Sequence, residues 1–493
     1  MADLRLIDLT VTPAGADRPV VACVDLDVPA GQRVLLVGPS GAGKSTVLRA
    51  LAGLLEDDVD ARGEVLLDGR PARPGEVGLL LQDPLDTVVA ATAGRDTAFG
   101  PENAGLPREE VWRRVARAHA AARYAAGRDR DVATLSGGER QRLALAGVLA
   151  AQPSVLLLDE PTSMLDAPTA AQVRGAVLEA AAGRTLVVVD HDLAGWAPHV
   201  DRVLVLGRGG RLVADGAPGR VFAGSRSLLA DGLWLPGAQA PAPVDVPAGL
   251  LAPQLAVPEA ATGGALLTGR GLGLRRRRRS LRPVPPATVL REVDVELAAG
   301  SATALTGPSG SGKSSLLAVL AGLARPTGEL TAAPGLAGGL APQPWRWRSR
   351  ELAARLAWVP QFPEHTFVRA TVREEVAATP LALGRAEARG EQLLELLGLA
   401  HRADVNPFRL SGGEQRRLAL AGALAAGPAV LLADEPSVGQ DRGTWAVVAG
   451  LLAAAAREGV AVGVSSHDER LLGVLDGPVV ALRAGTRVVG AAA

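Results

Sequence analysis

The sequence predicts an α/β protein that contains two copies of one domain in tandem. Three observations support this prediction. The chain has 493 residues, which is enough for two or three domains of about 150 residues each. A glycine-rich segment occurs twice, each time between an apolar run typical of a buried strand and a segment with helical spacing. Four landmarks (a glycine, a glutamine, a serine and a histidine) recur 269, 279, 275 and 276 positions later. Such a long repeat indicates a duplicated domain, not a solenoid of short units.

Composition excludes several classes of protein. The 52 basic residues cancel the 52 acidic ones, so net charge gives no support for a nucleic-acid partner. The one cysteine, Cys23, excludes an internal disulfide and fits a reducing compartment, and we expect it to be a buried filler. The most apolar stretch, 418–433, has 16 residues and contains Gly427-Pro428, so it is too short and too irregular to span a membrane. The N-terminus has no apolar core of a signal peptide, and we expect a soluble chain.

Lysine usage is the first indication of chemistry. Lys44 and Lys313 are the only lysines, and the other 50 basic residues are arginine. Both lysines lie in the repeated glycine-rich segment. At these two positions the chain therefore needs a compact ammonium group on a slender stem, which a planar guanidinium does not replace.

The two glycine-rich segments have the pattern of a phosphate-binding loop. They follow the predicted strands 33–37 and 302–306 and open helices. The first loop comprises Gly38, Pro39, Ser40, Gly41, Ala42, Gly43, Lys44, Ser45 and Thr46, and the second comprises Gly307, Pro308, Ser309, Gly310, Ser311, Gly312, Lys313, Ser314 and Ser315. Glycines let successive backbone N–H groups surround phosphate oxygens, and the helix N-terminus favours an anion. We expect the lysines to reach the β- and γ-phosphates and Ser45 and Ser314 to bind Mg²⁺.

A second pair of motifs, Leu-Ser-Gly-Gly-Glu at 135–139 and 410–414, precedes the predicted helices 140–151 and 415–426. One such sequence is typical of a helix cap, but two copies at a matched distance after a phosphate loop indicate a functional motif. Its candidate nucleotide-binding residues are Ser136, Gly137, Gly138, Ser411, Gly412 and Gly413.

Carboxylates and histidines follow further predicted strands. The apolar runs 155–158 and 430–433 end in Asp159-Glu160 and Asp434-Glu435. The carboxyl edge of a doubly wound sheet is where such folds bind ligands. We expect the first acid of each pair to hold Mg²⁺ and the second to polarise the attacking water. The predicted strands 185–190 and 460–465 lead to His191 and His467, which are candidates for contact with the γ-phosphate.

Two segments lie outside the repeat. An insert at 341–348 alternates Trp and Arg, which fits either a partner-binding patch or a decorated surface loop. Residues 224–263 are rich in Pro and Ala, have few charges, and read as a semi-extended tether. The expected organisation is therefore domain 1 at 1–223, a linker at 224–263 and domain 2 at 264–493.

These motifs together resemble those of the ATP-binding-cassette (ABC) ATPases, and the chain looks like two fused domains of that family. The resemblance covers nearly all residues outside the linker. The resemblance implies an ATPase that has ATP as its substrate and Mg²⁺ as its cofactor. It also implies that Glu160, Glu435, His191 and His467 are the catalytic residues. It adds Gln82 and Gln361 to the metal ligands, which are then Ser45, Gln82, Asp159, Ser314, Gln361 and Asp434. Each domain is expected to have a RecA-like core, an antiparallel β subdomain and a helical subdomain that carries the Leu-Ser-Gly-Gly-Glu signature. The D-loop aspartates would be Asp166 and Asp441, although the residues before Asp441 depart from the usual pattern.

The family also implies that each ATP lies between the phosphate loop of one half and the signature of the other. In this chain that pairing would be intramolecular, Lys44 with Ser411 and Lys313 with Ser136, and both sites look complete. The aromatic residue that usually stacks on adenine is missing near 11–13 and near 271–279. An arginine from 275–279 can stack instead, or this stretch is a solvated loop, and GTP use stays open.

The segments after the two glutamines, 82–86 and 361–367, resemble those of energy-coupling-factor (ECF) importers of vitamins and metal ions. So do 96–103 and 439–441. That group implies a transmembrane coupling protein and a substrate-binding membrane subunit as partners, with this chain peripheral on the cytoplasmic face of the membrane. Contact candidates are Pro84, Leu85, Phe362 and Phe367.

Two alternatives stay open. One is the fused ATPase of a sugar-type importer, whose second site is typically degenerate, whereas this one retains Lys313, Ser411, Glu435 and His467. The other is a soluble translation-associated double cassette, which would carry a charged helical linker in place of the uncharged one seen here. Excision-type DNA-repair cassettes are excluded by the single cysteine, since they contain cysteine-rich zinc modules.

Overall fold

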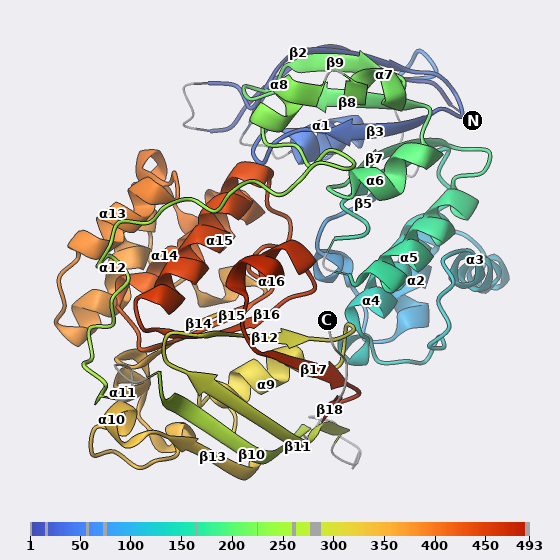
Figure 1. The fold of residues 1–493 in the computed structure, drawn as a ribbon. Helices are drawn as coiled ribbons and strands as arrows, with labels where there is room; N and C mark the ends of the chain where they lie inside the picture. The colour runs from blue at the N-terminus through green and yellow to red at the C-terminus, as the bar shows by residue number, and fades with distance from the viewer. Residues whose placement is uncertain are drawn as a thin grey trace. The chain divides into compact units, whose positions relative to one another are not determined.

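A computed structural model describes residues 2–14, 18–55, 59–71, 76–163, 165–223, 225–258, 263–276 and 287–488. The chain divides into two compact units, Met1–Gln239 and Ala240–Ala493 (Figure 1). Each unit contains a three-stranded antiparallel sheet and a six-stranded, mainly parallel sheet. The predicted α/β class and duplication are therefore confirmed.

In the first unit the antiparallel sheet has the order β2-β1-β4 and the larger sheet the order β5-β6-β7-β3-β8-β9. The strands are β1 (Leu4–Thr12), β2 (Val21–Val28), β3 (Arg33–Val37), β4 (Asp60–Leu67), β5 (Val77–Leu80), β6 (Val155–Asp159), β7 (Thr185–Val189), β8 (Arg202–Leu206) and β9 (Leu212–Gly216). The helices are α1 (Lys44–Leu51), α2 (Ala93–Asn103), α3 (Arg108–Ala121), α4 (Gly137–Ala150), α5 (Ala167–Ala180), α6 (Leu193–Trp196), α7 (Pro218–Ala223) and α8 (Ser225–Ala230), with 3-10 turns at Pro84–Thr87, Val132–Thr134 and Ala197–His199.

The central strands β3, β6 and β7 are buried on both faces of the sheet. Consecutive residues point to opposite sides of a strand, so each strand contributes side chains to two cores. Leu36, Leu157 and Val187 pack with α1 and the antiparallel sheet. Leu35 and Leu156 belong to the core on the other face, which includes residues of α4 and α5. All five residues of β6 are buried, as its continuous apolar sequence predicts.

The second unit repeats this arrangement with the sheet orders β11-β10-β13 and β14-β15-β16-β12-β17-β18. Its strands are β10 (Ala265–Arg276), β11 (Ala287–Ala298), β12 (Ala302–Thr306), β13 (Thr327–Ala332), β14 (Leu356–Val359), β15 (Val430–Asp434), β16 (Ala461–Ser465), β17 (Val479–Arg483) and β18 (Thr486–Arg487). Its helices are α9 (Lys313–Leu320), α10 (Pro334–Ala337), α11 (Ser349–Ala353), α12 (Val372–Leu383), α13 (Ala388–Leu396), α14 (Gly412–Ala425), α15 (Arg442–Arg457) and α16 (Glu469–Leu475), with 3-10 turns at Pro344–Arg346, Pro363–Thr366, Ala400–Arg402 and Pro407–Arg409.

The parallel strands bring the predicted site residues to one edge of each large sheet. In the first unit β3 runs parallel to β7, and β6 is parallel to β7 on its other side. In the second unit β12, β16 and β15 have the same relation. The phosphate loop, the acidic pair and the histidine therefore follow strands whose carboxyl ends lie side by side.

Several of the described residues between 225 and 258 make specific contacts with one of the two units. Leu233 and Leu235 belong to the core of the first unit. Beyond the division at Gln239, the chain passes along the second unit over α15 (light green in Figure 1), where the amide of Val244 donates to the Ala446 carbonyl at 3.0 Å. The carboxylate of Glu458 then accepts hydrogen bonds from the amides of Gly249 and Leu251, both at 2.8 Å.

Two side chains differ from sequence-based expectation. Cys23 is exposed, not buried, and its φ of 48° lies where the register of β1 and β2 shifts. In the insert, Trp347 is buried in the core and its indole N–H donates to the Ala341 carbonyl at 2.6 Å, while the Arg355 guanidinium lies over its ring. A partner-binding patch centred on Trp347 is therefore not present.

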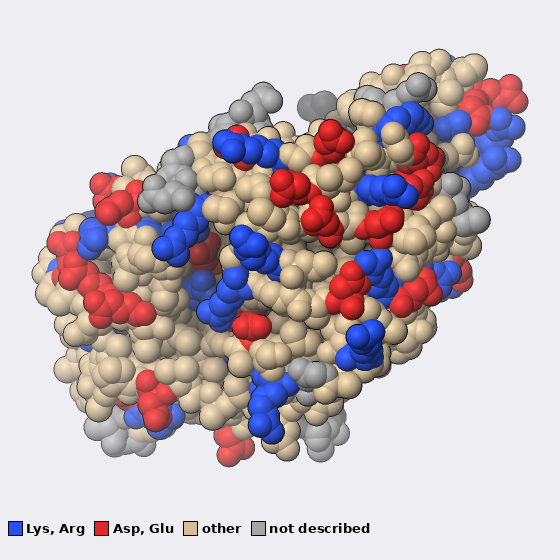
Figure 2. Space-filling model, turned by 90° about the horizontal axis from the view of Figure 1, so that it is seen from above, with Lys and Arg blue, Asp and Glu red and all other residues tan. Residues whose placement is uncertain are grey.

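No helix in the described part of the chain is long and apolar enough to cross a membrane. On the face seen in Figure 2, basic and acidic side chains are interspersed, in keeping with the equal numbers of the two in the sequence.

Candidate nucleotide-binding and hydrolysis sites

Each predicted phosphate loop lies between a parallel strand and a helix, β3 and α1 in the first unit and β12 and α9 in the second. The residues before the helices, Gly43 and Gly312, have φ of 89° and 104°. These left-handed angles favour glycine. A Cβ at Gly43 would also lie only 2.6 Å from the carbonyl oxygen of Val20, so the approach of the loop to the start of β2 requires glycine.

The two lysines lie within the curve of their own loops. Lys44 Nζ donates to the carbonyls of Gly38 and Pro39 at 2.9 and 3.0 Å. Lys313 Nζ makes the equivalent contacts at 2.7 and 3.4 Å. Both side chains are buried, so each ammonium group occupies a space bounded by backbone. A guanidinium is broader and planar and does not match this space, which fits the use of lysine only here.

The first acid of each pair lies beside the hydroxyl that follows the lysine. Asp159 is hydrogen-bonded to Ser45, and Asp434 to Ser314. Burial and then repulsion from Glu160 raise the pKa of Asp159 to about 6, and burial also raises the pKa of Asp434. Asp159 Oδ1 is buried without a hydrogen-bond partner in the described part of the chain.

These donors fit Mg²⁺, a hard cation that prefers oxygen ligands. In the first half Ser45, Gln82 and Asp159 would supply a hydroxyl, an amide and a carboxylate oxygen. A bound cation would give the buried Asp159 Oδ1 the partner that it lacks among the described residues. Among the described residues no group of three or more His, Cys, Asp or Glu side chains is arranged to hold a metal ion.

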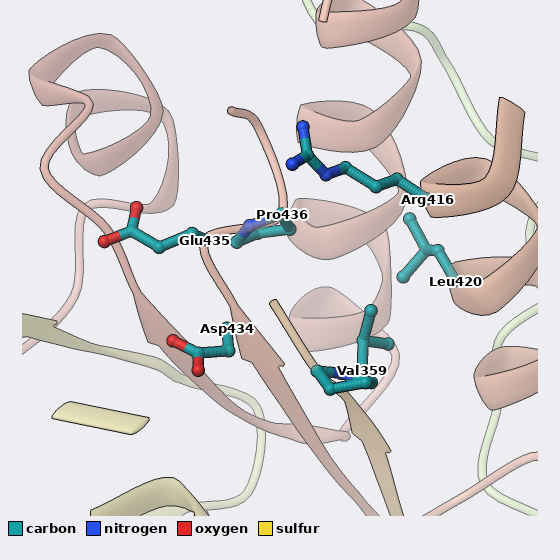
Figure 3. A pocket seen from close by; sticks show the side chains of 7 residues that line it. Val359, Arg416, Leu420, Asp434, Glu435 and Pro436 are labelled. Carbon is teal, nitrogen blue, oxygen red and sulfur yellow. The ribbon is translucent and has the colours of Figure 1, made fainter. Parts of the chain in front are cut away.

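The second acids, Glu160 and Glu435, have a backbone conformation that is rare for side chains other than glycine. Their φ angles are 49° and 51°, in the left-handed region. Their amides donate to the neighbouring strand, at 2.8 Å to Val189 and 3.0 Å to Ser465. Figure 3 shows the consequence in the second half, where the carboxyl groups of Asp434 and Glu435 point to the same side although consecutive strand residues normally alternate. Strain of this kind clusters at functional sites.

In the first half three side chains contact the Glu160 carboxylate. His191 Nε2 lies 3.0 Å from Glu160 Oε1. Ser163 Oγ and Gln82 Nε2 donate to Glu160 Oε2 at 2.6 and 2.9 Å. Burial alone would oppose ionisation, but the charge and hydrogen bond of His191, followed by Ser163, lower the pKa of Glu160 to about 2. Glu160 is therefore an oriented carboxylate at neutral pH.

In the second half His467 Nδ1 lies 3.1 Å from Glu435 Oε2, and Lys313 Nζ lies 3.9 Å from Glu435 Oε1. The hydrogen bond to Glu435 raises the pKa of His467, although burial opposes this. A cavity of about 10 Å³, roughly the room for one water, lies at the base of this acidic pair (Figure 3). It is lined by Val359, Pro360, Arg416, Leu420, Asp434, Glu435 and Pro436.

Both signature motifs are helix N-termini with a complete capping box. The side chains of Ser136 and Ser411 cap α4 and α14, while those of Glu139 and Glu414 accept hydrogen bonds from the backbone amides of these serines at 2.8 and 2.9 Å. The following glycines leave the helix end open to an anion. A Cβ at Gly138 would lie 2.5 Å from a methyl group of α5, so this glycine is also needed for packing.

The structure thus brings together, within each half, the phosphate loop, the acidic pair and the histidine. The D-loop aspartates, Asp166 and Asp441, cap α5 and α15 through hydrogen bonds to the backbone at 2.9 and 2.8 Å. Gln361 is half-buried just after β14. Of the arginines proposed to stack on adenine, Arg275 and Arg276 end β10, and the remaining three lie outside the described residues.

Sequence reasoning missed Ser163 as a partner of Glu160, and it missed Asp190. The carboxylate of Asp190 is buried and accepts hydrogen bonds from Thr162 Oγ1 at 2.6 Å, from the Thr162 amide at 3.2 Å and from the Asp192 amide at 2.9 Å. An acidic residue directly after an apolar strand and before His191 was the signal that could have identified it.

The sequence matches a known protein family and several of its members. The family model described as "ABC transporter" matches residues 21–163 and 290–438. The chain is 33% identical over 92% of its length to a putative HMP/thiamine import ATP-binding protein of Bacillus subtilis, covering 85% of that protein. It is 36% identical over 98% of its length to a putative ABC transporter ATP-binding protein of Streptomyces coelicolor, covering 92% of it. Among solved structures, CbiO1 of Clostridium perfringens, part of the transporter complex CbiONQ, aligns with 46% of this chain and 93% of its own length at 28% identity, with a TM-score of 0.41.

Proposed function

Because the chain belongs to the ABC transporter family as a tandem ATP-binding protein and is therefore an ATPase, we propose that it is the motor subunit of an ECF-type importer. The expected cargo is a vitamin or a transition-metal ion. The observation that carries the proposal is that each half joins a complete phosphate loop, an acidic pair and a histidine, so that neither site is degenerate. The name of the Bacillus relative, which refers to HMP/thiamine import, supports a vitamin-type cargo.

Each step of ATP hydrolysis has a candidate residue in both halves. The loop amides and Lys44 or Lys313 bind the phosphates of ATP. Glu160 or Glu435 accepts a hydrogen bond from the attacking water and orients it toward the γ-phosphate. A histidine, His191 or His467, is placed to donate to a phosphate oxygen once it leaves its carboxylate partner. When bound, Mg²⁺ supplies charge neutralisation of the phosphates, held by Ser45, Gln82 and Asp159 and by their counterparts Ser314, Gln361 and Asp434.

We further propose that the membrane subunits bind next to the two glutamines. Val89 and Val368, seven residues after Gln82 and Gln361, are 55% and 76% exposed. They are held in the same way in both halves. Asp96 accepts hydrogen bonds from the amides of Val89 and Ala90, and Glu375 accepts them from the amides of Val368 and Arg369. An exposed apolar side chain on a fixed turn is suited to a partner helix.

Aromatic side chains extend this surface in the second half. Phe408 is 59% exposed and packs edge-on against Phe367, with ring centroids 5.9 Å apart. Phe367 is itself buried, so it supports Phe408 more than it offers contact area of its own. Phe362 and Pro84 are half-buried, and the side chain of Leu85 lies outside the described residues.

The experiment that tests the function is to tag the chain, solubilise native membranes gently and identify the proteins that co-purify. A small multi-span coupling protein together with a second membrane subunit is the expected result, and the second subunit would identify the cargo. Transmembrane subunits of a sugar importer would overturn the ECF assignment. Ribosomal proteins without a membrane partner would overturn the transporter role.

The proposed surface has its own test. Val368→Asp combined with Phe408→Asp is expected to reduce recovery of the membrane subunits about tenfold or more, because a charge would be buried in an apolar contact. Basal ATPase activity of the isolated chain is expected to be unchanged. Val213→Asp is the matched control, since Val213 is 55% exposed but lies on β9. Equal losses in both variants would argue against the surface.

A further inference from the structure

The two hydrolytic centres differ in how the catalytic glutamate is held. In the first half a ring of contacts starts and ends at Glu160. The Ser163 hydroxyl donates to the Glu160 carboxylate, and the adjacent Thr162 donates two hydrogen bonds to Asp190. His191, which follows Asp190 in the chain, contacts the Glu160 carboxylate again. The ring therefore joins the turn after β6 to the residues after β7.

Asp190 is the residue on which this ring depends. Its carboxylate is buried, and burial raises its pKa, so the fold places a polar group where it is costly unless its oxygens are satisfied. One oxygen receives both donors of Thr162 and the other receives the Asp192 amide. These three donors belong to the two segments that carry Ser163 and His191, and the Trp196 side chain of α6 is a further hydrogen-bond partner of Asp190. The carboxylate thus fixes both segments at once.

In the second half the equivalent ring is open at two points. Ser437 stands where Thr162 stands, and its hydroxyl is buried without a hydrogen-bond partner in the described part of the chain. Ser466 stands where Asp190 stands, and its short side chain accepts from the Asp468 amide at 3.0 Å, which reproduces only the Asp192 contact. Val438 stands at the position of Ser163 and has no hydroxyl to offer Glu435.

We propose that Asp190 is a positioning residue for ATP hydrolysis in the first half, acting through Thr162 and Ser163 to hold the Glu160 carboxylate in its catalytic orientation. It follows that the two ATP sites turn over at different rates, with the chemical step faster at Glu160 than at Glu435. This inference rests on the proposed hydrolytic roles of these two glutamates. Its physical basis is that a pre-oriented base reaches the transition state without first being reoriented.

The ring includes contacts that nucleotide binding is expected to change. Gln82 and His191 would leave Glu160 for Mg²⁺ and the γ-phosphate, as their assigned roles require. The hydrogen bonds between Ser163 and Glu160, and between Thr162 and Asp190, involve no group assigned to Mg²⁺ or to the phosphates. They are therefore the restraints that remain on Glu160 when ATP is bound.

The test separates the two sites by silencing one of them. In a Glu435→Gln background, single-turnover hydrolysis of preloaded MgATP reports the first half. Asp190→Ser copies the second half, and we expect it to slow this step about tenfold, while the Kd for MgATP and the KM stay unchanged. Thr162→Val removes the hydroxyl at nearly constant volume and is expected to slow it similarly, whereas Thr162→Ser retains both donors and should restore the rate.

The reciprocal experiment uses a Glu160→Gln background, in which the second half is observed. Ser466→Asp combined with Val438→Ser supplies the missing acceptor and the missing hydroxyl, and is expected to accelerate single-turnover hydrolysis several-fold. Ser466→Ala is the control and should have little effect on the rate.

Each result decides something definite. A rate unchanged by both Asp190→Ser and Thr162→Val, or a loss that follows weaker MgATP binding, overturns the positioning role. If Asp190→Ser does not fold, Thr162→Val against Thr162→Ser still decides the question. A wild-type chain that binds MgATP but does not hydrolyse it would overturn the proposed hydrolytic mechanism itself, which is a different outcome from hydrolysis that ignores Asp190.

Discussion

The two halves of this chain share their motifs but differ in the immediate surroundings of the catalytic glutamate. Glu160 is contacted by His191, Ser163 and Gln82, and Glu435 by His467 and Lys313. Duplicated motifs therefore specify which chemistry is available, whereas the residues between the motifs decide how firmly each group is oriented. Motif comparison alone would call these sites equivalent.

The largest expected effect comes from removing the carboxylates themselves. Glu160→Gln and Glu435→Gln each keep the shape of the side chain but lose the base, and the double variant should lower steady-state ATPase activity by about 100-fold or more while still binding ATP. The single variants compare the two halves directly. If the chemical step is faster at Glu160 than at Glu435, then Glu160→Gln causes the larger loss of single-turnover rate. Glu109→Gln, an exposed position on α3, serves as the control. Activity retained in the double variant would exclude both glutamates as the base.

The second expected effect concerns the phosphate loops, in which the halves are most alike. Lys44→Arg and Lys313→Arg should each weaken ATP binding at their own site by about tenfold despite the retained charge, since the guanidinium cannot replace an ammonium that is hydrogen-bonded to two loop carbonyls. Nucleotide affinity can be measured by titration calorimetry. Arg49→Lys on α1 exchanges the same residue types at an exposed position and should be neutral. Unchanged affinity in Lys44→Arg would show that the rarity of lysine has no functional cause here.

The motifs could be placed from sequence because their chemistry fixes local structure. A phosphate loop needs glycines where φ is positive, and a strand in a parallel sheet has a continuous apolar sequence. The order strand, loop and helix can therefore be predicted from the sequence. The capping boxes at Ser136 and Ser411 follow from Glu three residues later. These features depend on residues close together in the chain.

The features that sequence did not reveal depend on distant contacts or unusual backbone angles. The contact of Ser163 with Glu160 requires the left-handed φ of Glu160, which no local pattern predicts for glutamate. Cys23 faces outward because the register between β1 and β2 shifts nearby, and a shift of this kind reverses which side chains are buried. The burial of Trp347 is set by Arg355 and the Ala341 carbonyl, which surround a tryptophan whose own neighbours in sequence suggested an exposed loop.

The smallest expected effect is a difference in how the two halves respond to acid. In the first half His119 is buried beside Thr97 and Tyr124, and burial lowers its pKa below the ordinary 6.5. A histidine with a lowered folded-state pKa stabilises the fold above pH 6.5, and that contribution is lost as the pH falls through its folded-state pKa. In the second half the raised pKa of His467 has the opposite sign, because its ion pair with Glu435 is fully present below pH 6.5 and is lost as the pH rises through the raised value.

Urea unfolding at a series of pH values between 5 and 8 would separate these contributions. His119→Gln should flatten the loss of stability on acidification, because glutamine retains hydrogen-bonding capacity but does not titrate. His467→Gln should instead lower stability at acidic pH and have less effect at pH 8, since the ion pair it removes is present mainly at low pH. Parallel pH profiles for wild type and both variants would contradict the assignment of opposite signs to the two halves.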